Sequence, residues 1–254
     1  HACVKGRLPM LVRRSAVPGH AAVTHRRWRQ PQQLKKNTYQ EKNQKTRALN
    51  TPYGQLMVME NPPLDAMMRA LNQGAEDIWV RTHQQWPDIN IDVVAHIGST
   101  NTALMDVARA GQLTHIRVML AAEQTQGRGR LGKPWVTHVG DALTFSIALP
   151  WPASLPLAGL SLATGVAITR ALEATPHTDM ARFMPRIKWP NDIWVNDQKL
   201  AGILVEVCGQ AQQRCVVIGV GVNLYPPTGV LSHSGVAPTG LANYMGDGVP
   251  PDAS

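Results

Sequence analysis

Cysteine is scarce in this chain of 254 residues, which has only Cys3, Cys208 and Cys215. Three scattered thiols cannot form a disulfide framework, so they favour a reducing, cytoplasmic compartment. Cys208 and Cys215 flank a predicted turn and can face each other across a hairpin. No cluster of histidines or further cysteines nearby offers a metal site, so we interpret both as ordinary thiols.

Long apolar runs and evenly spread charge are also missing. No stretch approaches the roughly 18 apolar residues that cross a bilayer, which argues against a membrane protein. The net charge of +8 belongs to residues 1–50, which hold twelve lysines and arginines but a single acid, Glu41. The remaining residues hold thirteen basic and sixteen acidic side chains. The folded part therefore lacks the basic footprint expected for specific DNA binding.

Residues 1–55 are predicted to be a basic extension that is disordered or not native to the protein. From residue 26 to 50 nearly every side chain is polar or charged, and no apolar stripe of helical period appears. A basic arm for nucleic acid and an organelle-targeting peptide remain open as alternatives. Residues 56–91 are predicted to be a helical lead-in, because apolar positions follow helical spacing over residues 64–71.

The most unusual stretch is Gly127-Arg-Gly-Arg-Leu-Gly-Lys-Pro-Trp135, in which three glycines alternate with cations. Glycine weakens regular structure and unpaired cations resist burial, so this is not core sequence. Glycines let successive backbone N–H groups line a concave nest, and arginine forks bind phosphate or carboxylate. The stretch predicts an anion-binding loop; a solvated basic turn and an RGG-type nucleic-acid segment are the alternatives.

This loop is predicted to join two strands of a packed sheet. Residues 117–123 are an apolar run of strand length, and residues 142–149 partly alternate. A further strand is predicted at 91–95, after which Gly98-Ser-Thr-Asn-Thr102 opens a helix that Gly111 ends. The hydroxyl and amide groups at that helix start are either ordinary N-caps or contacts for a small polar ligand.

A long helix and a broken strand follow. Residues 155–174 carry apolar side chains on both faces of a helix, so we expect burial against a sheet. In Ile187-Lys-Trp-Pro-Asn-Asp-Ile193, proline and the Asn-Asp pair interrupt a strand. The interruption indicates either a bulge or hairpin corner, or a strand opened so that its polar residues face a pocket.

The last predicted element is an antiparallel hairpin of residues 199–207 and 216–224. Gly219 and Gly221 remove side chains from alternate positions on one face, which suits a ligand lying against the sheet. Residues 225–254 are rich in proline and glycine and show no clear element.

Four separated motifs closely resemble the catalytic domain of bacterial biotin–protein ligases, the biotin–[acetyl-CoA-carboxylase] ligases. They are Gly98-Ser-Thr-Asn101; Gln124 with Gly127-Arg-Gly-Arg-Leu-Gly132 and Trp135; Lys188-Trp-Pro-Asn-Asp192; and Lys199-Leu-Ala-Gly-Ile-Leu-Val-Glu206 leading to Gly219-Val-Gly-Val-Asn223. The resemblance covers residues 92–225. It implies an α/β domain of the α+β type over residues 92–254, class II synthetase-like, with a mixed, largely antiparallel sheet backed by helices.

The resemblance also implies an ATP-dependent ligase with two half-reactions. Biotin and MgATP give biotinyl-5′-adenylate and pyrophosphate, and a lysine of a biotin carboxyl carrier domain, as in acetyl-CoA carboxylase, then takes the biotinyl group. The residues fit this chemistry, because joining a carboxylate to an α-phosphate requires cations and backbone donors around two anions. Expected partners are thus biotin, ATP and the carrier domain, with no membrane; a homodimer is left open.

Site residues follow from the resemblance position by position. The expected catalytic cations are Lys199, Arg128 and Arg130. Together with these cations, the expected biotin site comprises Ser99, Thr100, Asn101, Gln124, Gly129, Gly202 and Leu204. The expected nucleotide side comprises Gly127, Gly132, Trp135, Lys188, Asn191, Asp192 and Asn223. Asp192 is the expected Mg²⁺ ligand, because Mg²⁺ takes carboxylate oxygens together with water and phosphate oxygens. The loop over residues 124–134 is expected to order as a lid on the bound adenylate.

The sequence departs from the family pattern at both ends. Residues 1–91 show no recognition-helix pattern, so no repressor function is predicted. Too few residues follow Asn223 for the small C-terminal β-barrel of many members. A lipoate or octanoate ligase or transferase of the same fold is the nearest alternative, and the Gly-Arg-Gly-Arg loop with Lys-Trp-Pro-Asn-Asp favours biotin. A nucleic-acid-binding protein acting through residues 1–50 is the alternative of another class.

Overall fold

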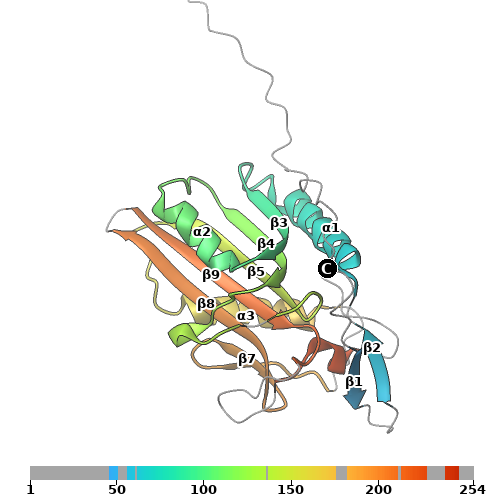
Figure 1. Ribbon diagram of the computed structural model, residues 1–254. Coiled ribbons are helices and arrows are strands. Elements are labelled where there is room, and N and C mark those ends of the chain that lie inside the picture. Colours follow the sequence, from blue (N-terminus) through green and yellow to red (C-terminus); the bar gives the residue numbers. More distant parts are fainter. Residues whose placement is uncertain are drawn as a thin grey trace, which may run out of the picture.

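A computed structural model shows how these segments are arranged (Figure 1). It describes residues 46–50, 56–60, 62–135, 137–175, 182–210, 213–227 and 238–245. The predicted disordered extension therefore lies mostly outside the described residues. Its described part is a strand, β1 (Thr46–Asn50), which pairs antiparallel with β2 (Leu56–Glu60), so the prediction of disorder is wrong for these five residues. The predicted helical lead-in is corrected accordingly, because it begins with a strand of this hairpin.

A seven-stranded sheet forms the centre of the protein. Its strands are β3 (Asn90–Ile97), β4 (Arg117–Gln124), β5 (Ala142–Trp151), β6 (Arg186–Lys188), β7 (Asp192–Val195), β8 (Gln198–Gln210) and β9 (Gln213–Asn223). The spatial order is β3-β4-β5-β9-β8-β7-β6, in which β3 and β4 are parallel and all other neighbours are antiparallel. The predicted mixed, largely antiparallel sheet is confirmed.

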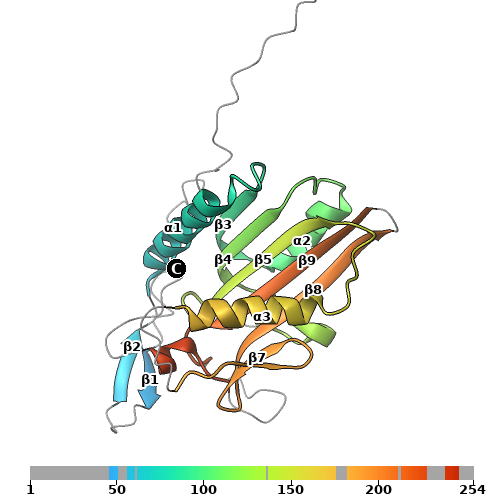
Figure 2. The same cartoon turned by 180° about the vertical axis from the view of Figure 1, so that it is seen from behind.

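Helices cover both faces of this sheet, and the alternation of side chains along β5 shows which helix lies where. Leu143 and Phe145 pack in the clusters of both α1 (Leu64–Thr82) and α3 (Leu160–Glu173). Ala148 points the other way and packs against α2 (Thr100–Arg109). Figure 2 shows α3 crossing the face that α2 does not cover. The α2 face is therefore the side on which a site can open.

The helix α1 belongs to the main core. Its buried residues Met67, Leu71 and Ala75 pack in one cluster with Ile91 of β3 and Val118 of β4. The described structure thus shows no boundary at residue 91, where the sequence suggested a lead-in next to a separate domain. Within the described residues, every helix is too short or too polar to cross a bilayer.

The helix predicted at 155–174 is shorter than expected. Gly159, with φ +81°, stands just before α3, and this left-handed residue sets the chain direction into the helix. The inner face packs on the sheet as predicted, with Leu172 buried. The outer apolar face is not covered by the described residues, since Leu162 and Val166 are exposed. The expectation that both apolar faces of this helix are buried is therefore wrong for the outer face.

The segment after β9 contains an element that the sequence did not indicate. A 3-10 turn, η2 (Leu241–Tyr244), buries Leu241 and Tyr244 in the same cluster as Phe183. The Tyr244 and Phe183 rings lie with centroids 5.4 Å apart. Because the segment with this turn lies against the start of β8 and the end of β9, part of the predicted irregular tail is core.

Candidate active site

Two glycines make the floor of a pocket on the α2 face. In the β8–β9 register, Gly219 lies opposite Leu204 and Gly221 opposite Gly202. A Cβ at Gly219 would collide with the side-chain amide of Asn101, and one at Gly221 would collide with the indole of Trp135. The bare backbone is thus required by side chains from other elements that lie directly on the sheet, whereas the alternating glycines had suggested a ligand at these positions.

The N-terminus of α2 forms one end of the pocket. Ser99 is the N-cap, whose Oγ accepts from the Thr102 N–H at 3.4 Å. The backbone N–H of Thr100 donates to Gln124 Oε1 at 2.7 Å, and the Thr100 hydroxyl oxygen lies 3.1 Å from the same atom. Ser99, Thr100 and Gln124 are buried and also line the cavity. The N-cap interpretation is therefore confirmed for Ser99, and contact of the motif with a small polar ligand stays a prediction.

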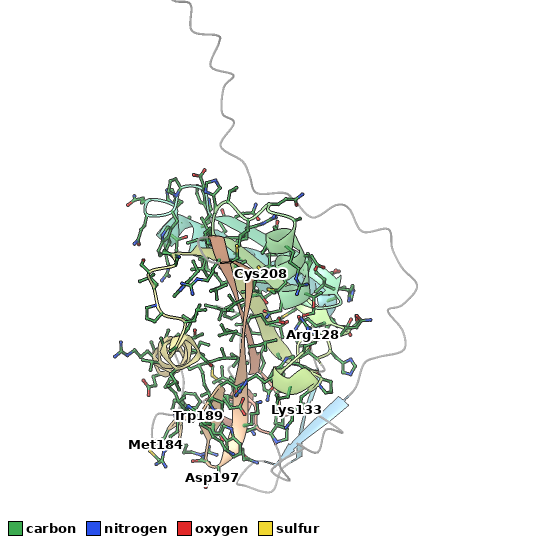
Figure 3. The ribbon with its side chains drawn as sticks, turned by 90° about the vertical axis from the view of Figure 1, so that its left-hand side faces the viewer. Arg128, Lys133, Met184, Trp189, Asp197 and Cys208 are labelled. Atoms are coloured by element: carbon green, nitrogen blue, oxygen red, sulfur yellow. The ribbon has the colours of Figure 1, made fainter. Side chains whose placement is uncertain are left out.

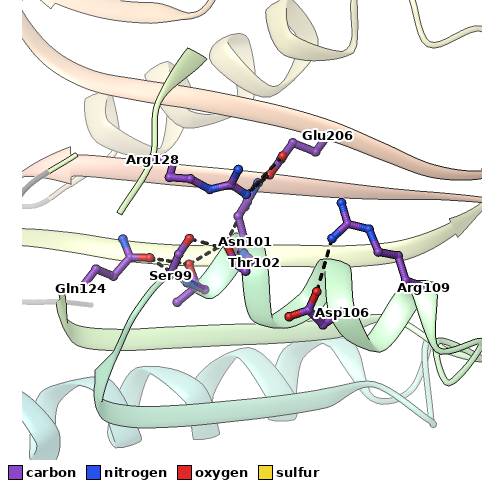
Figure 4. Close-up of polar contacts among 10 residues, drawn as sticks. Ser99, Asn101, Thr102, Asp106, Arg109, Gln124, Arg128 and Glu206 are labelled. Atoms are coloured by element: carbon purple, nitrogen blue, oxygen red, sulfur yellow. Dashed lines mark hydrogen bonds and ion pairs between the residues drawn. The ribbon is translucent and has the colours of Figure 1, made fainter. Parts of the chain in front are cut away.

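A polar chain continues beneath this end of the pocket (Figure 4). The Thr100 hydroxyl lies 2.7 Å from Ser146 Oγ, which donates to Asn101 Oδ1 at 2.7 Å. Asn101 Nδ2 in turn donates to Glu206 at 2.8 Å. Both amide atoms of Asn101 are thus engaged by protein groups, so its orientation is fixed before any ligand binds.

The glycine loop lines the pocket, although its tip is exposed, with Leu131 92% accessible. Arg128 and Pro134 form an isolated antiparallel bridge, and Leu131 at the tip has φ +57°. Arg128 Nη2 lies 3.2 Å from Glu206 on β8, and Arg130 Nη1 donates to Asn191 Oδ1 at 3.3 Å. The two loop arginines therefore attach to two different regions of the sheet, β8 and the β6–β7 corner.

The broken strand is a hairpin corner whose polar residues also face the pocket. A cis Trp189–Pro190 bond lies between β6 and β7. Lys188 Nζ lies 3.4 Å from the ring centre of Trp194, a cation–π distance. Asn191 Nδ2 donates to the Ile203 carbonyl at 2.9 Å. Both interpretations of this sequence are therefore correct.

A cavity of about 400 Å³ lies between the floor, the helix and the loop. Five cations and one carboxylate line it: Arg128, Arg130, Lys133, Lys188 and Lys199, with Asp192. Lys199 Nζ pairs with Asp192 Oδ1 at 2.8 Å and lies 5.7 Å from the ring centre of Trp135. The excess of positive charge fits an anionic ligand. Figure 3 shows Arg128 and Lys133 on the same side of the sheet.

Fifteen of the seventeen site residues predicted from the sequence line this cavity. The lining set is Ser99, Thr100, Asn101, Gln124, Arg128, Gly129, Arg130, Trp135, Lys188, Asn191, Asp192, Lys199, Gly202, Leu204 and Asn223. Gly127 and Gly132 are not among the lining residues. Gly127 instead permits a close turn, because a Cβ there would strike the Trp135 carbonyl, and Gly132 supplies a positive φ of 71°.

Three residues of the site were missed or left without a role. Ser146 lies on β5 and binds Asn101, whereas Glu206 stood in a quoted motif but carried no assignment. Thr239 donates its N–H to the Lys199 carbonyl at 2.9 Å, and its own carbonyl accepts from Asn223 Nδ2 at 3.0 Å. A carboxylate inside an apolar strand was the available signal for Glu206; Thr239 lies in a stretch without a pattern.

The sequence model of the biotin/lipoate A/B protein ligase family matches residues 93–223. Over 146 residues the chain is 36% identical to the bifunctional ligase/repressor BirA of Salmonella typhimurium, which covers 57% of this chain and 43% of that protein. Over 169 residues it is 34% identical to the biotin–[acetyl-CoA-carboxylase] ligase of Mycobacterium tuberculosis. This match covers 64% of this chain and 57% of that ligase.

A solved biotin protein ligase of Leishmania major in complex with biotin is 29% identical, with a TM-score of 0.49, and covers 60% of this chain and 63% of that chain. The chain spans about half the length of the two curated relatives above. The family match extends from β3 to the end of β9 and contains every motif quoted for the resemblance. The chain belongs to the biotin/lipoate A/B protein ligase family.

Proposed function

We propose that this chain activates biotin with ATP and transfers it to a lysine of a biotin carboxyl carrier domain. The observation that carries the proposal is the cation-lined pocket on the glycine floor, with buried hydroxyl and amide groups at one end. A polar end suits a ureido head group, and a cationic end suits a carboxylate that meets a phosphate. The curated relatives named as biotin ligases support biotin as the acid.

In the first half-reaction, a carboxylate oxygen of biotin attacks the α-phosphorus of ATP. The bond from that phosphorus to the bridging oxygen breaks, and pyrophosphate leaves with the electron pair. Two anions must approach each other, so Lys199, Arg128 and Arg130 supply compensating positive charge. Mutational data on comparable fixed donors give about 2.7–4 kcal/mol for one well-placed donor.

In the second half-reaction, the amine of the acceptor lysine attacks the acyl carbon. The bond from that carbon to the phosphate oxygen breaks, AMP leaves, and the nitrogen loses a proton to form the amide. The mixed anhydride reacts with any amine, so the glycine loop must retain it until the acceptor arrives. The contacts of Arg128 and Arg130 with β8 and the β6–β7 corner give the loop two points of attachment.

Mg²⁺ enters this reaction as part of the substrate MgATP. Within the described residues no group of three or more histidines, cysteines or carboxylates could hold a metal by itself. One lining carboxylate, Asp192, with nearby amide oxygens fits an ion held mainly by phosphate oxygens and water. Asp192 would then serve both the ion and Lys199.

The test is exchange of labelled pyrophosphate into ATP, driven separately by biotin, lipoate and octanoate. The proposal expects exchange with biotin alone. Exchange with lipoate or octanoate and none with biotin would instead assign the pocket to the alternative acids of this fold. A second assay follows the mass of a carrier domain, which should rise by one biotinyl group on its acceptor lysine.

A further inference from the structure

Glu206 joins the glycine loop to the N-terminal part of α2. Its carboxylate accepts from Arg128 Nη2 at 3.2 and 3.3 Å and from Asn101 Nδ2 at 2.8 Å (Figure 4). The Glu206 side chain is only 23% exposed, whereas that of Arg128 is 44% exposed. The arginine is therefore the partner whose position depends on the carboxylate, because it is the less enclosed of the two.

From Glu206 the polar chain returns to the start of the loop. It passes through Asn101 on α2 and Ser146 on β5 to the Thr100 hydroxyl, and the Thr100 backbone N–H then donates to Gln124 at the end of β4. Gln124 begins the connection that carries the glycine loop. The loop is thus attached at its start and at Arg128 to the same continuous set of hydrogen bonds, which runs beneath the pocket.

The pairing with Glu206 leaves Arg128 able to bind a ligand. Arginine carries five N–H donors, and both contacts with Glu206 use the single nitrogen Nη2. Among the described residues Nη1 and Nε have no hydrogen-bond partner, so both can bind an anion while Nη2 stays attached. Since Arg128 lines the cavity, Glu206 holds the guanidinium at the pocket without neutralising all of its donors.

We propose that Glu206 is a positioning residue for the loop, holding Arg128 over the pocket floor in the orientation that receives the carboxylate and α-phosphate. A guanidinium group that is fixed in advance loses less side-chain entropy when the anion binds. We therefore expect the substrates to bind more tightly and the adenylate to form faster. The role of Glu206 in adenylation rests on the proposed function. Its role in holding the loop does not.

The test compares Glu206→Gln with Asp92→Asn. Glutamine keeps an acceptor for Asn101 but removes the charge that pairs with Arg128. Asp92 is the matched control, because it pairs with Arg117 at 3.2 Å, has the same 23% side-chain exposure, and does not line the cavity. Without substrates, trypsin should cut after Arg128 or Arg130 about two- to fivefold faster in Glu206→Gln, the change expected for one half-exposed ion pair. Trypsin should cut the loop of Asp92→Asn at the same rate as that of the wild type.

A double-mutant cycle separates positioning from general structure. Glu206→Gln should lower kcat/KM for biotin-dependent pyrophosphate exchange about two- to fivefold, and in an Arg128→Gln background it should have no further effect. Equal loop cleavage in Glu206→Gln and wild type would overturn the proposal, as would kinetic effects of the two substitutions that simply multiply. If wild type shows no biotin-dependent exchange, the proposed function fails, yet the cleavage comparison still decides whether Glu206 holds the loop.

Discussion

The ammonium group of Lys199 lies 2.8 Å from the carboxylate of Asp192, across the neighbouring antiparallel strands β8 and β7. Lys199 is also close to the floor, since a Cβ at Gly202 would lie 3.4 Å from its Nζ. The Lys199 backbone is held as well, because its carbonyl accepts from the Thr239 N–H. A cation fixed at both ends in this way is prepared to meet an anion at one place on the floor.

Lys199→Ala should therefore abolish adenylation and leave the fold intact. We expect pyrophosphate exchange to fall by about 100-fold or more, the usual effect of removing a fixed donor to a developing negative charge. The half-exposed ion pair contributes about 1 kcal/mol or less to the free energy of unfolding. Arg109→Ala is the control, because Arg109 pairs with Asp106 on the exposed side of α2. Near-normal exchange in Lys199→Ala would show that Lys199 is a surface cation with no role in adenylation.

Asp192→Asn should weaken exchange in a way that depends on Mg²⁺. The amide keeps the shape of the carboxylate but loses the charge that orients Lys199 and attracts the ion. We expect the Mg²⁺ concentration for half-maximal exchange to rise several-fold, together with a fall of about tenfold or more in the maximal rate. A lower rate with an unchanged Mg²⁺ requirement would limit Asp192 to orienting Lys199.

Gly221→Ala should disturb the floor of the pocket. The added methyl group would overlap the Trp135 indole, so the ring must move or the strand must shift. Overpacking of this kind costs about 1–3 kcal/mol of stability, and we expect a fall in exchange beyond what the lower thermal midpoint explains. Gly165→Ala in α3 provides the control, because its methyl group would lie 3.3 Å from Ile187, away from the cavity. Tryptophan fluorescence would report displacement of the indole.

Arg130→Gly should release the adenylate. Arg130 bonds to Asn191 at 3.3 Å, so its loss frees one of the two loop attachments. We expect retention of the adenylate to suffer more than its synthesis, which would increase biotin labelling of a bystander such as serum albumin. The comparison with wild type is made at matched exchange activity. Equal background labelling, with loop cleavage unaffected by biotin and ATP, would leave Arg130 as a static phosphate contact.

The facing cysteines predict a loss of stability at alkaline pH. Cys208 and Cys215 pair directly across β8 and β9, as the sequence suggested. Burial, with a smaller contribution from Cys208, raises the pKa of the Cys215 thiol above its ordinary value of 9.0. As pH rises, the unfolded chain therefore loses the Cys215 proton before the folded chain does. The contribution of Cys215 to the free energy of unfolding is complete below pH 9.0 and declines as pH rises above it. Urea unfolding at pH 8 and pH 10 should show a smaller decline for Cys215→Ala than for wild type.

Local patterns in the sequence were sufficient for most of the strands and for the motif residues of the pocket. The β8–β9 hairpin follows from two β-rich runs around a polar turn, and the floor follows from Gly219 and Gly221 at alternate positions. The fifteen lining residues were expected because the quoted motifs resemble those of biotin–protein ligases. The hairpin and its glycine positions are encoded within short windows, so they do not depend on how distant segments meet.

Only the tertiary structure decided which side chains meet and which surfaces stay open. Arg128 and Glu206 are 78 residues apart in the sequence, and neither position alone indicates the other. Burial of Tyr244 and exposure of Val166 were likewise unpredictable, because composition measures how apolar a residue is and not whether another element covers it. The sequence determined the chemistry available to the site through its residue types and spacing. The packing of α2, the loop and β8 onto one sheet face decided that Glu206 holds Arg128, since long-range contacts depend on chain topology.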